Sequence, residues 1–445
     1  MNAQFRRLAA TAAKFTADGY PAEAIKYWKQ ALQLSPENAE VLFCLGDLYR
    51  MIGDLGQAER FYIKSQQFNK DPVLPLSRLA LIEERRGNVQ QAKNLVNDLV
   101  QVPHPNANAL AVWGSACRRL GQYADAIGVL EKALNGKRHR KELSLIHSVL
   151  AQNYEASGSY DLAFHHFAAA NLKRNQQYNP SERRSQVDRL LAVPHIPPLH
   201  HKPMPLTPVL IVGFMRSGST LLEQSLGLHS QVSTCGEHEV LGAIAQQIPA
   251  QLGFRQPWPQ ATAQFTPRQA ENVGLLYLSE MGKAGSRQNA TVIVDKALSN
   301  YQLLQLAHRI LPKVKIVHCI RDPIDTCLSC FCTNFSQAHG FSTRLEWLAH
   351  EYKLYQRVMA HHQRTLDIHT VVYEDLVRQP RDVLSAVLSF IGLPWEEECM
   401  QPERNQRVAA TASYAQVKQA FHTKSIGRSK RYLQHLEPLI SALKG

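Results

Sequence analysis

The chain has 445 residues, of which 44% are hydrophobic and 20% are charged, and its formal net charge is +13. At roughly 100–200 residues per domain, this length suggests two to four domains, and the composition is typical of a globular chain. The sequence has no apolar run of about 18 residues, and its basic N-terminal segment lacks the core of a signal peptide. We therefore expect a cytoplasmic protein with no membrane insertion, and its positive charge favours anionic partners.

Glycines recur with a regular spacing in the first third of the chain. Four of them are 34 residues apart, a fifth follows after 37 residues, and each is followed five residues later by alanine: Gly19, Gly53, Gly87, Gly121 and Gly158. Glycine takes the positive φ that ends a helix, and a small residue lets paired helices pack closely. Residues 3–173 therefore resemble the tetratricopeptide repeats, and we expect a helical solenoid that binds a protein or peptide.

The segment 174–206 separates this array from the rest of the chain. Its first half is polar, and its second half contains Pro194, Pro197, Pro198, Pro203 and Pro205. Proline lacks the backbone N–H that a helix interior needs, so we expect a semi-rigid linker. A second domain then covers residues 207–445.

The second domain opens with a predicted strand, loop and helix. Residues 208–213 are a short apolar run with β-branched side chains, residues 214–220 contain glycine and small polar residues, and residues 221–226 have helical character. The free amides and the dipole at a helix N-terminus attract anions. This layout therefore predicts a site for a phosphate-like group.

The loop departs from the nucleotide-binding pattern G-x-x-x-x-G-K-[ST] at one position. Gly213, Gly218 and Thr220 match the pattern, but Ser219 stands where the lysine is needed. That lysine normally reaches the β- and γ-phosphates, so its absence argues against hydrolysis of a nucleoside triphosphate. Arg216, inside the loop, instead offers a fork of donors for a phosphate or sulfonate.

Residues 213–224 resemble the 5′-phosphosulfate loop of sulfotransferases. The likeness is greatest to the tyrosylprotein sulfotransferases and their bacterial relatives with tetratricopeptide repeats. It implies a PAPS-dependent sulfotransferase, which moves a sulfonate from 3′-phosphoadenosine-5′-phosphosulfate (PAPS) to an acceptor hydroxyl and releases 3′,5′-adenosine bisphosphate. The loop residues that it assigns to cofactor binding are Arg216, Ser217, Gly218, Ser219 and Thr220.

A second motif is similar to the family's 3′-phosphate site. Residues 315–320 are typical of a strand, Arg321 follows it directly, and Ser329 lies eight residues further on. If a helix begins after Pro323, the two side chains can converge on one phosphate. The plain alternative is a surface pair of Arg321 with Asp322 and an ordinary helical serine.

Three further segments carry the resemblance. Lys296 follows a predicted strand and matches the lysine that contacts the oxygen between phosphate and sulfonate. Tyr373 begins a Tyr-Glu-Asp-Leu segment whose tyrosine lies near the nucleotide. Ser425 and Arg428 belong to a segment that resembles the C-terminal loop over the cofactor.

Transfer to a hydroxyl needs a base that takes its proton. The segment Cys-Gly-Glu-His-Glu at 235–239 resembles the Cys-Gly-Glu-Glu segment in which the family's proposed base lies, with a histidine between the two glutamates. Glu237 is the first candidate for the base and Glu239 the second, and His238 is a minor alternative. Under this interpretation Glu237, Lys296 and Glu239 form the catalytic set.

The resemblance covers essentially the whole chain and implies its architecture. We expect a multidomain protein with an N-terminal all-α tetratricopeptide-repeat solenoid and a C-terminal α/β, P-loop-like sulfotransferase domain with a mostly parallel sheet. A tyrosine of a peptide or protein held by the repeats is one suggested acceptor, and carbohydrate, lipid and small-molecule hydroxyls stay open. No metal is expected, because protein cations neutralise the transferred charge.

Two other functions fit parts of the sequence. One is a P-loop nucleotide kinase or nucleoside triphosphatase, which the serine at the lysine position disfavours. The other is a non-catalytic repeat scaffold with a nucleotide-sensing domain. No zinc finger or interleaved aromatic and basic sheet motif is present, so we expect no nucleic-acid partner.

Overall fold

The computed structural model of the chain describes residues 3–17, 20–69, 71–199, 204–335, 337–405 and 420–444. The chain divides into two compact units, Met1–Asn175 and Gln176–Gly445. Each unit has its own core and is described by itself.

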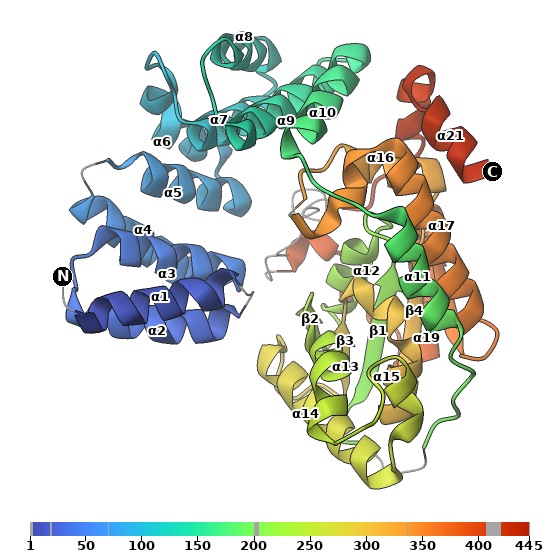
Figure 1. The fold of residues 1–445 in the computed structure, drawn as a ribbon. Helices are drawn as coiled ribbons and strands as arrows, with labels where there is room; N and C mark the ends of the chain where they lie inside the picture. Colours follow the sequence, from blue (N-terminus) through green and yellow to red (C-terminus); the bar gives the residue numbers. More distant parts are fainter. Residues whose placement is uncertain are drawn as a thin grey trace. The chain divides into compact units, whose positions relative to one another are not determined.

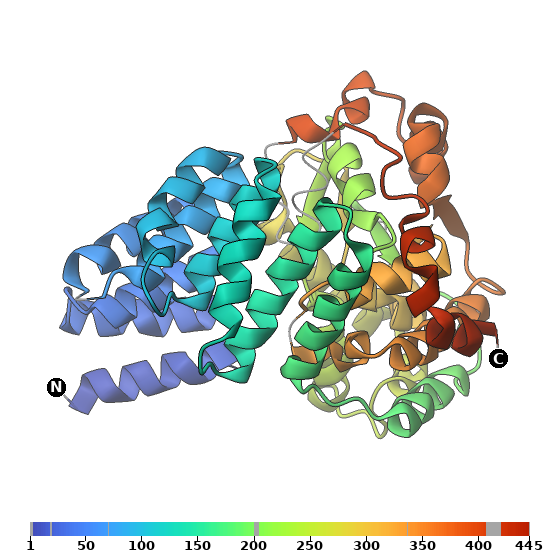
Figure 2. The same cartoon turned by 90° about the horizontal axis from the view of Figure 1, so that it is seen from above.

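The first unit is built from helices that pack as successive pairs (Figures 1 and 2). They are α1 (Ala3–Ala17), α2 (Pro21–Leu34), α3 (Ala39–Met51), α4 (Leu55–Phe68), α5 (Val73–Arg86), α6 (Val89–Val100), α7 (Ala107–Arg119), α8 (Tyr123–Leu134), α9 (Arg140–Ala156) and α10 (Tyr160–Arg174). This arrangement confirms the predicted array of two-helix repeats.

The repeated small residues explain the turns and the close packing of this unit. Positive φ angles occur at Gly53, Gly87, Gly121 and Gly158, one or two residues after the ends of α3, α5, α7 and α9, while Gly19 lies outside the described residues. The alanines five residues after the glycines have no exposed surface: Ala24, Ala58, Ala92, Ala126 and Ala163. A larger side chain at these positions would separate the paired helices.

The second unit contains a five-stranded parallel sheet with the strand order β2-β3-β1-β4-β5 (Figure 1). The strands are β1 (Thr207–Gly213), β2 (Val232–Gly236), β3 (Val292–Asp295), β4 (Lys315–Ile320) and β5 (Ile368–Val372). Residues 208–213 of β1 are all buried, and alternate side chains point to opposite faces. Both faces of the sheet are therefore covered, as in other parallel sheets.

Helices and short 3-10 turns surround this sheet. The α-helices are α11 (Pro180–Leu191), α12 (Ser219–Leu226), α13 (Val240–Gln251), α14 (Pro267–Ala284), α15 (Leu304–Ile310), α16 (Pro323–Phe331), α17 (Leu345–His362), α18 (Tyr373–Arg378), α19 (Pro380–Ile391) and α21 (Glu437–Lys444). The 3-10 turns are η1 (Gln260–Gln264), η2 (Leu298–Gln302), η3 (Gln337–Thr343), η4 (Glu397–Met400), η5 (Pro402–Arg404) and η6 (Arg428–His435).

The strand order places a crevice at the end of β1. The chain leaves β1 for the outer strand β2, returns to β3, and then crosses to β4 on the other side of β1. Loops that leave neighbouring strands in opposite directions open a space between them, which is where ligands bind in such sheets. Here the carboxyl ends Gly213, Asp295 and Ile320 meet at this edge.

The segment expected to be a linker contains a helix. α11 lies within residues 174–206, belongs to the second unit and packs against α17. Pro180 is at the start of α11, where its missing N–H costs nothing, and the Asn179 side chain accepts a hydrogen bond from the amide of Glu182. The prediction of a linker therefore differs from the structure over its first half, and the second unit begins before residue 207.

The sequence predicts no membrane-spanning segment, and the described helices bear on this expectation. Among these residues, no helix is long and apolar enough to cross a membrane.

Candidate active site

The loop after β1 requires glycine at two positions. A Cβ atom on Gly213 would lie 2.5 Å from the carbonyl oxygen of Cys319 on β4. Gly218 has a φ of +94°, and a Cβ atom there would lie 2.4 Å from the ring of Tyr373. The loop thus passes close to β4 and to the start of α18, and it enters α12 at Ser219.

Arg216 lies between the two predicted phosphate motifs. Its Nε atom donates to the Oγ atom of Ser329 on α16 across 3.0 Å. Its carbonyl oxygen accepts from the Nη1 atom of Arg321, which follows β4, at 3.3 Å. The structure therefore brings the two motifs together through Arg216. The hydroxyl of Ser329, which was expected to meet a phosphate, here accepts a hydrogen bond from Arg216.

The surroundings of Arg216 are cationic. Burial, together with the charges of Arg428 and Arg321, lowers the pKa of Arg216 to about 10. The Oγ atom of Ser217 is buried and has no hydrogen-bond partner among the described residues, and Ser219 and Thr220 are buried in the first turn of α12. Since clustered guanidinium groups repel each other, an anion here would stabilise the site and give Ser217 a partner.

Asp325 holds the C-terminal loop in place. Its carboxylate accepts hydrogen bonds from the amides of Gly427 and Ser429 at 2.6 and 2.7 Å, and lies 3.6 Å from Nη2 of Arg321. Burial alone would raise the pKa of Asp325, but the hydrogen bonds from Ser429 and Gly427 and the charge of Arg321 lower it more. The carbonyl oxygen of Ser425 also accepts from Arg321.

Tyr373 packs against the same group of residues. The guanidinium carbon of Arg321 lies 4.8 Å from the centre of its ring, a cation–π contact. Tyr373 is therefore fixed between Arg321 and the loop at Gly218. These contacts place six predicted cofactor residues around one region: Arg216, Gly218, Arg321, Ser329, Tyr373 and Ser425.

Lys296 and Glu237 form an ion pair at the ends of β3 and β2. The side chain of Lys296 is 1% exposed, whereas that of Glu237 is 49% exposed. Glu223 on α12 lies 4.0 Å from the Nζ atom of Lys296. A buried ammonium group needs such counter-charges, and the exposed carboxylate of Glu237 remains accessible from solvent.

The two alternative bases occupy different positions. Glu239 is exposed at the start of α13, and its side chain does not cap that helix. His238 is also exposed. The pairing with Lys296 favours Glu237 by geometry.

Asp295 shapes the turn that carries Lys296. It accepts hydrogen bonds from the hydroxyl of Tyr277 at 2.8 Å, the side-chain amide of Asn300 at 2.9 Å and the amide of Ala297 at 2.8 Å. Burial raises the pKa of Asp295 to about 7, although these hydrogen bonds oppose the rise.

Asp325 and Glu223 contribute to the site without having been predicted from the sequence. Asp325 lies in the first turn of α16, four residues after Arg321, and its carboxylate lies 3.6 Å from that guanidinium group. Glu223 follows the loop on α12, and nothing in the sequence shows that it faces Lys296. Within the described ranges, no group of three or more metal-binding side chains occurs.

Comparisons with known proteins agree with this geometry. The model of the sulfotransferase family matches residues 208–397, which include the sheet, the loop and both phosphate motifs. This match to the sulfotransferase family lies within the second unit. Models of tetratricopeptide repeats match residues 17–53 and 77–140 in the first unit.

Three similar proteins match one or both parts of the chain. An uncharacterized protein of Aquifex aeolicus (strain VF5) is 29% identical over 80% of the chain, and the chain spans 48% of that relative. Tetratricopeptide repeat protein 7B of Homo sapiens is 32% identical over 25% of the chain and 12% of its own length. The sulfotransferase domain of the Synechococcus PCC 7002 olefin synthase is 19% identical, with a TM-score of 0.40. The match covers 57% of this chain and 98% of that domain.

Proposed function

We propose that the sulfotransferase-family domain transfers a sulfonate from PAPS to an acceptor hydroxyl and releases 3′,5′-adenosine bisphosphate. The observation that carries this proposal is the position of Arg216, which bonds to Ser329 and lies beside Arg321 at the carboxyl edge of the sheet. One guanidinium group between two anion sites suits a nucleotide with phosphates at both its 3′ and 5′ positions.

The residues around Arg216 divide into two binding regions. We assign the 5′ end to the loop residues Arg216, Ser217, Gly218, Ser219 and Thr220, where helix α12 begins. We assign the 3′-phosphate to Arg321, Ser329, Ser425 and Arg428, with Tyr373 fixing the guanidinium of Arg321. The orphaned hydroxyl of Ser217 and the mutual repulsion of the arginines fit a bound anion.

Glu237 and Lys296 carry the chemistry in this proposal. When bound, PAPS supplies the sulfonate. The acceptor oxygen forms a bond to sulfur while the bond between sulfur and the bridging oxygen breaks, and the electron pair of the broken bond stays on the bridging oxygen. Lys296 stabilises the negative charge that grows on the bridging oxygen, more in the transition state than before it. Glu237 takes the acceptor proton, since its carboxylate is half exposed and lies against Lys296.

The repeats supply a second binding function. Stacked two-helix repeats commonly hold proteins or peptides, so we propose a protein or peptide partner for residues 3–173, with a tyrosine-bearing acceptor as one candidate. We further propose a cytoplasmic location, because all eight cysteines are free thiols and seven of them are buried.

Release of 3′,5′-adenosine bisphosphate from PAPS tests the proposed reaction. The full chain is incubated with PAPS and a panel of hydroxyl compounds, and the nucleotides are separated by chromatography. We expect release that depends on an acceptor and is lost in Lys296→Met. Phosphate transfer from ATP with magnesium, without any use of PAPS, would replace this proposal by a kinase.

A further inference from the structure

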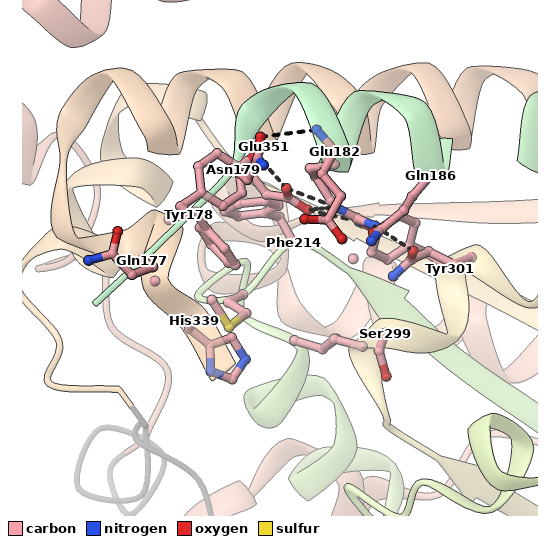
Figure 3. Close-up of a pocket in the computed structure, with 17 residues that line it drawn as sticks. Gln177, Tyr178, Asn179, Glu182, Gln186, Phe214, Ser299, Tyr301, His339 and Glu351 are labelled. Atoms are coloured by element: carbon pink, nitrogen blue, oxygen red, sulfur yellow. Dashed lines mark hydrogen bonds and ion pairs between the residues drawn. The ribbon is translucent and has the colours of Figure 1, made fainter. Parts of the chain in front are cut away.

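A pocket of about 430 Å³ adjoins the phosphate loop within the second unit (Figure 3). Its floor includes Gly213, Phe214 and Met215, the residues that lead directly to Arg216. Leu298 and Ser299, which closely follow Lys296, line it as well. A molecule in this pocket would therefore touch both segments that carry the proposed transfer residues. Its volume is in the range of sites for small molecules.

Helix α11 and the residues before it form one wall of the pocket. Gln177, Tyr178 and Gln186 lie on this wall, ahead of residues 208–397, which match the family model. The shape and the polarity of the pocket are thus partly set by a segment outside the family domain. The backbone at Gln177 lies so close to Gly340 that a Cβ atom on Gly340 would be 2.1 Å from the Gln177 carbonyl oxygen.

Two carboxylates, Glu182 and Glu351, and one guanidinium group, Arg183, line the pocket. Arg183 on α11 donates to the carboxylate of Glu351 on α17 at 2.9 and 3.0 Å, and to the side-chain oxygen of Gln302 at 3.0 Å (Figure 3). The hydroxyl of Tyr178 donates to Glu351 at 2.9 Å. With Glu182 also on the lining, carboxylates outnumber the guanidinium group, so an anionic ligand is disfavoured.

The remaining lining combines aromatic rings, the imidazole of His339, side-chain amides and the hydroxyls of Ser299 and Tyr301. The rings of Phe214 and Tyr178 each lie 6.1 Å from the ring of Phe341. Gln177 and Gln186 offer amides, which both donate and accept hydrogen bonds as hydroxyl groups do. A compact, uncharged polyol suits this lining, because the rings can cover its apolar face and the amides can bond to its hydroxyls.

We propose that this pocket binds the acceptor, and that the acceptor is an uncharged polyhydroxylated molecule of the size of a small sugar. The inference rests on the proposed sulfotransfer and specifies its substrate class. One hydroxyl of the ligand faces the phosphate loop, which leads to Arg216, and the turn at Ser299, which follows Lys296. The other hydroxyls bond to the glutamines of the α11 wall.

Saturation-transfer NMR on the full chain, with 3′,5′-adenosine bisphosphate present, tests this inference. The probes are methyl β-D-glucopyranoside, the anionic sugar glucuronate and the phenol 4-methylphenol. We expect transfer to the glucoside, weaker transfer to the other two, and a loss of about tenfold in glucoside affinity in Ser299→Phe, which fills the pocket. Ser389→Phe, which adds the same ring at an exposed position of α19, should change nothing.

The outcomes separate this inference from the proposed function. Transfer to the bisphosphate without transfer to the glucoside, or with stronger transfer to 4-methylphenol, would overturn the polyol acceptor and leave the sulfotransfer standing. Equal effects of the two phenylalanine variants would place the ligand elsewhere. No transfer to the bisphosphate would contradict the proposed function itself. Gln177→Leu should weaken the glucoside signal while bisphosphate binding stays unchanged.

Discussion

The Nε atom of Arg216 donates to the Oγ atom of Ser329 across 3.0 Å, and these residues lie 113 positions apart in the sequence. The hydrogen bond joins the loop after β1 to helix α16. Because Arg321 also donates to the carbonyl of Arg216, the two phosphate motifs share one arginine. Binding at one motif should therefore depend on the other.

Ser329→Ala tests this connection. Loss of a hydrogen bond to a charged group costs about 1.5–3 kcal/mol, so we expect bisphosphate affinity to fall by roughly tenfold or more. Thr326→Val is the matched control, since Thr326 lies one turn earlier on α16 and its buried hydroxyl has no partner in the described structure. Calorimetry of both variants decides the question, and an equal loss in the two would point to general damage to α16.

Glu237→Gln removes the proposed base and keeps the shape of the side chain. We expect turnover to fall by about 10²–10⁴-fold, the usual contribution of a general base, while the bisphosphate still binds. Glu239→Gln is the control, and it should retain nearly full turnover. Steady-state assays with PAPS compare the two variants. If Glu239→Gln is the inactive one, the base is the second glutamate of the segment.

Asp325→Asn should loosen the C-terminal loop. Asn offers one acceptor oxygen where the carboxylate now accepts from both Gly427 and Ser429, and the charge beside Arg321 is lost. We expect faster trypsin cleavage within residues 424–431 and weaker bisphosphate binding. Asp382→Asn, at an exposed position of α19, is the control. Unchanged cleavage in Asp325→Asn would show that other contacts hold the loop.

We expect the stability of α9 and α10 to depend on pH through His166. Burial, together with the charges of His147 and His165, lowers the pKa of His166 to about 4. Between an unfolded pKa of about 6.5 and the folded value, the unfolded chain binds the proton, so stability is lost as the pH falls through this range. Hydrogen exchange of α9 and α10 should show less protection at pH 5 than at pH 7, and His166→Phe should reduce this difference. An unchanged difference in the variant would exclude His166 as its source.

The repeats and the parallel sheet could be predicted because their determinants are local. The glycine period marks the helix ends, and the apolar runs that end at Gly213 and Ile320 mark buried strands. Helix α11 was not predicted, because only Val187 and Leu190 of its residues are buried and its main contact is polar. Sequence composition does not show that Arg183 meets Glu351 on α17.

Parts of the candidate site depend on contacts between distant segments. The sequence suggests that Arg216, Lys296 and Arg321 bear charge for an anion, since each follows a strand. It does not show that Ser329 bonds to Arg216, or that Glu223 lies 4.0 Å from Lys296. Such pairs follow from strand order and helix packing, which bring together residues that no local pattern connects.

Calorimetric titration with 3′,5′-adenosine bisphosphate, compared with ATP and magnesium, tests the central claim most directly. The wild-type chain and Arg321→Ala are measured under the same salt conditions, because binding of anions to arginines depends on ionic strength. We expect micromolar binding of the bisphosphate, a loss of at least about tenfold in Arg321→Ala, and weaker binding of ATP with magnesium. Tighter binding of ATP with magnesium, unaffected by Arg321→Ala, would contradict the central claim.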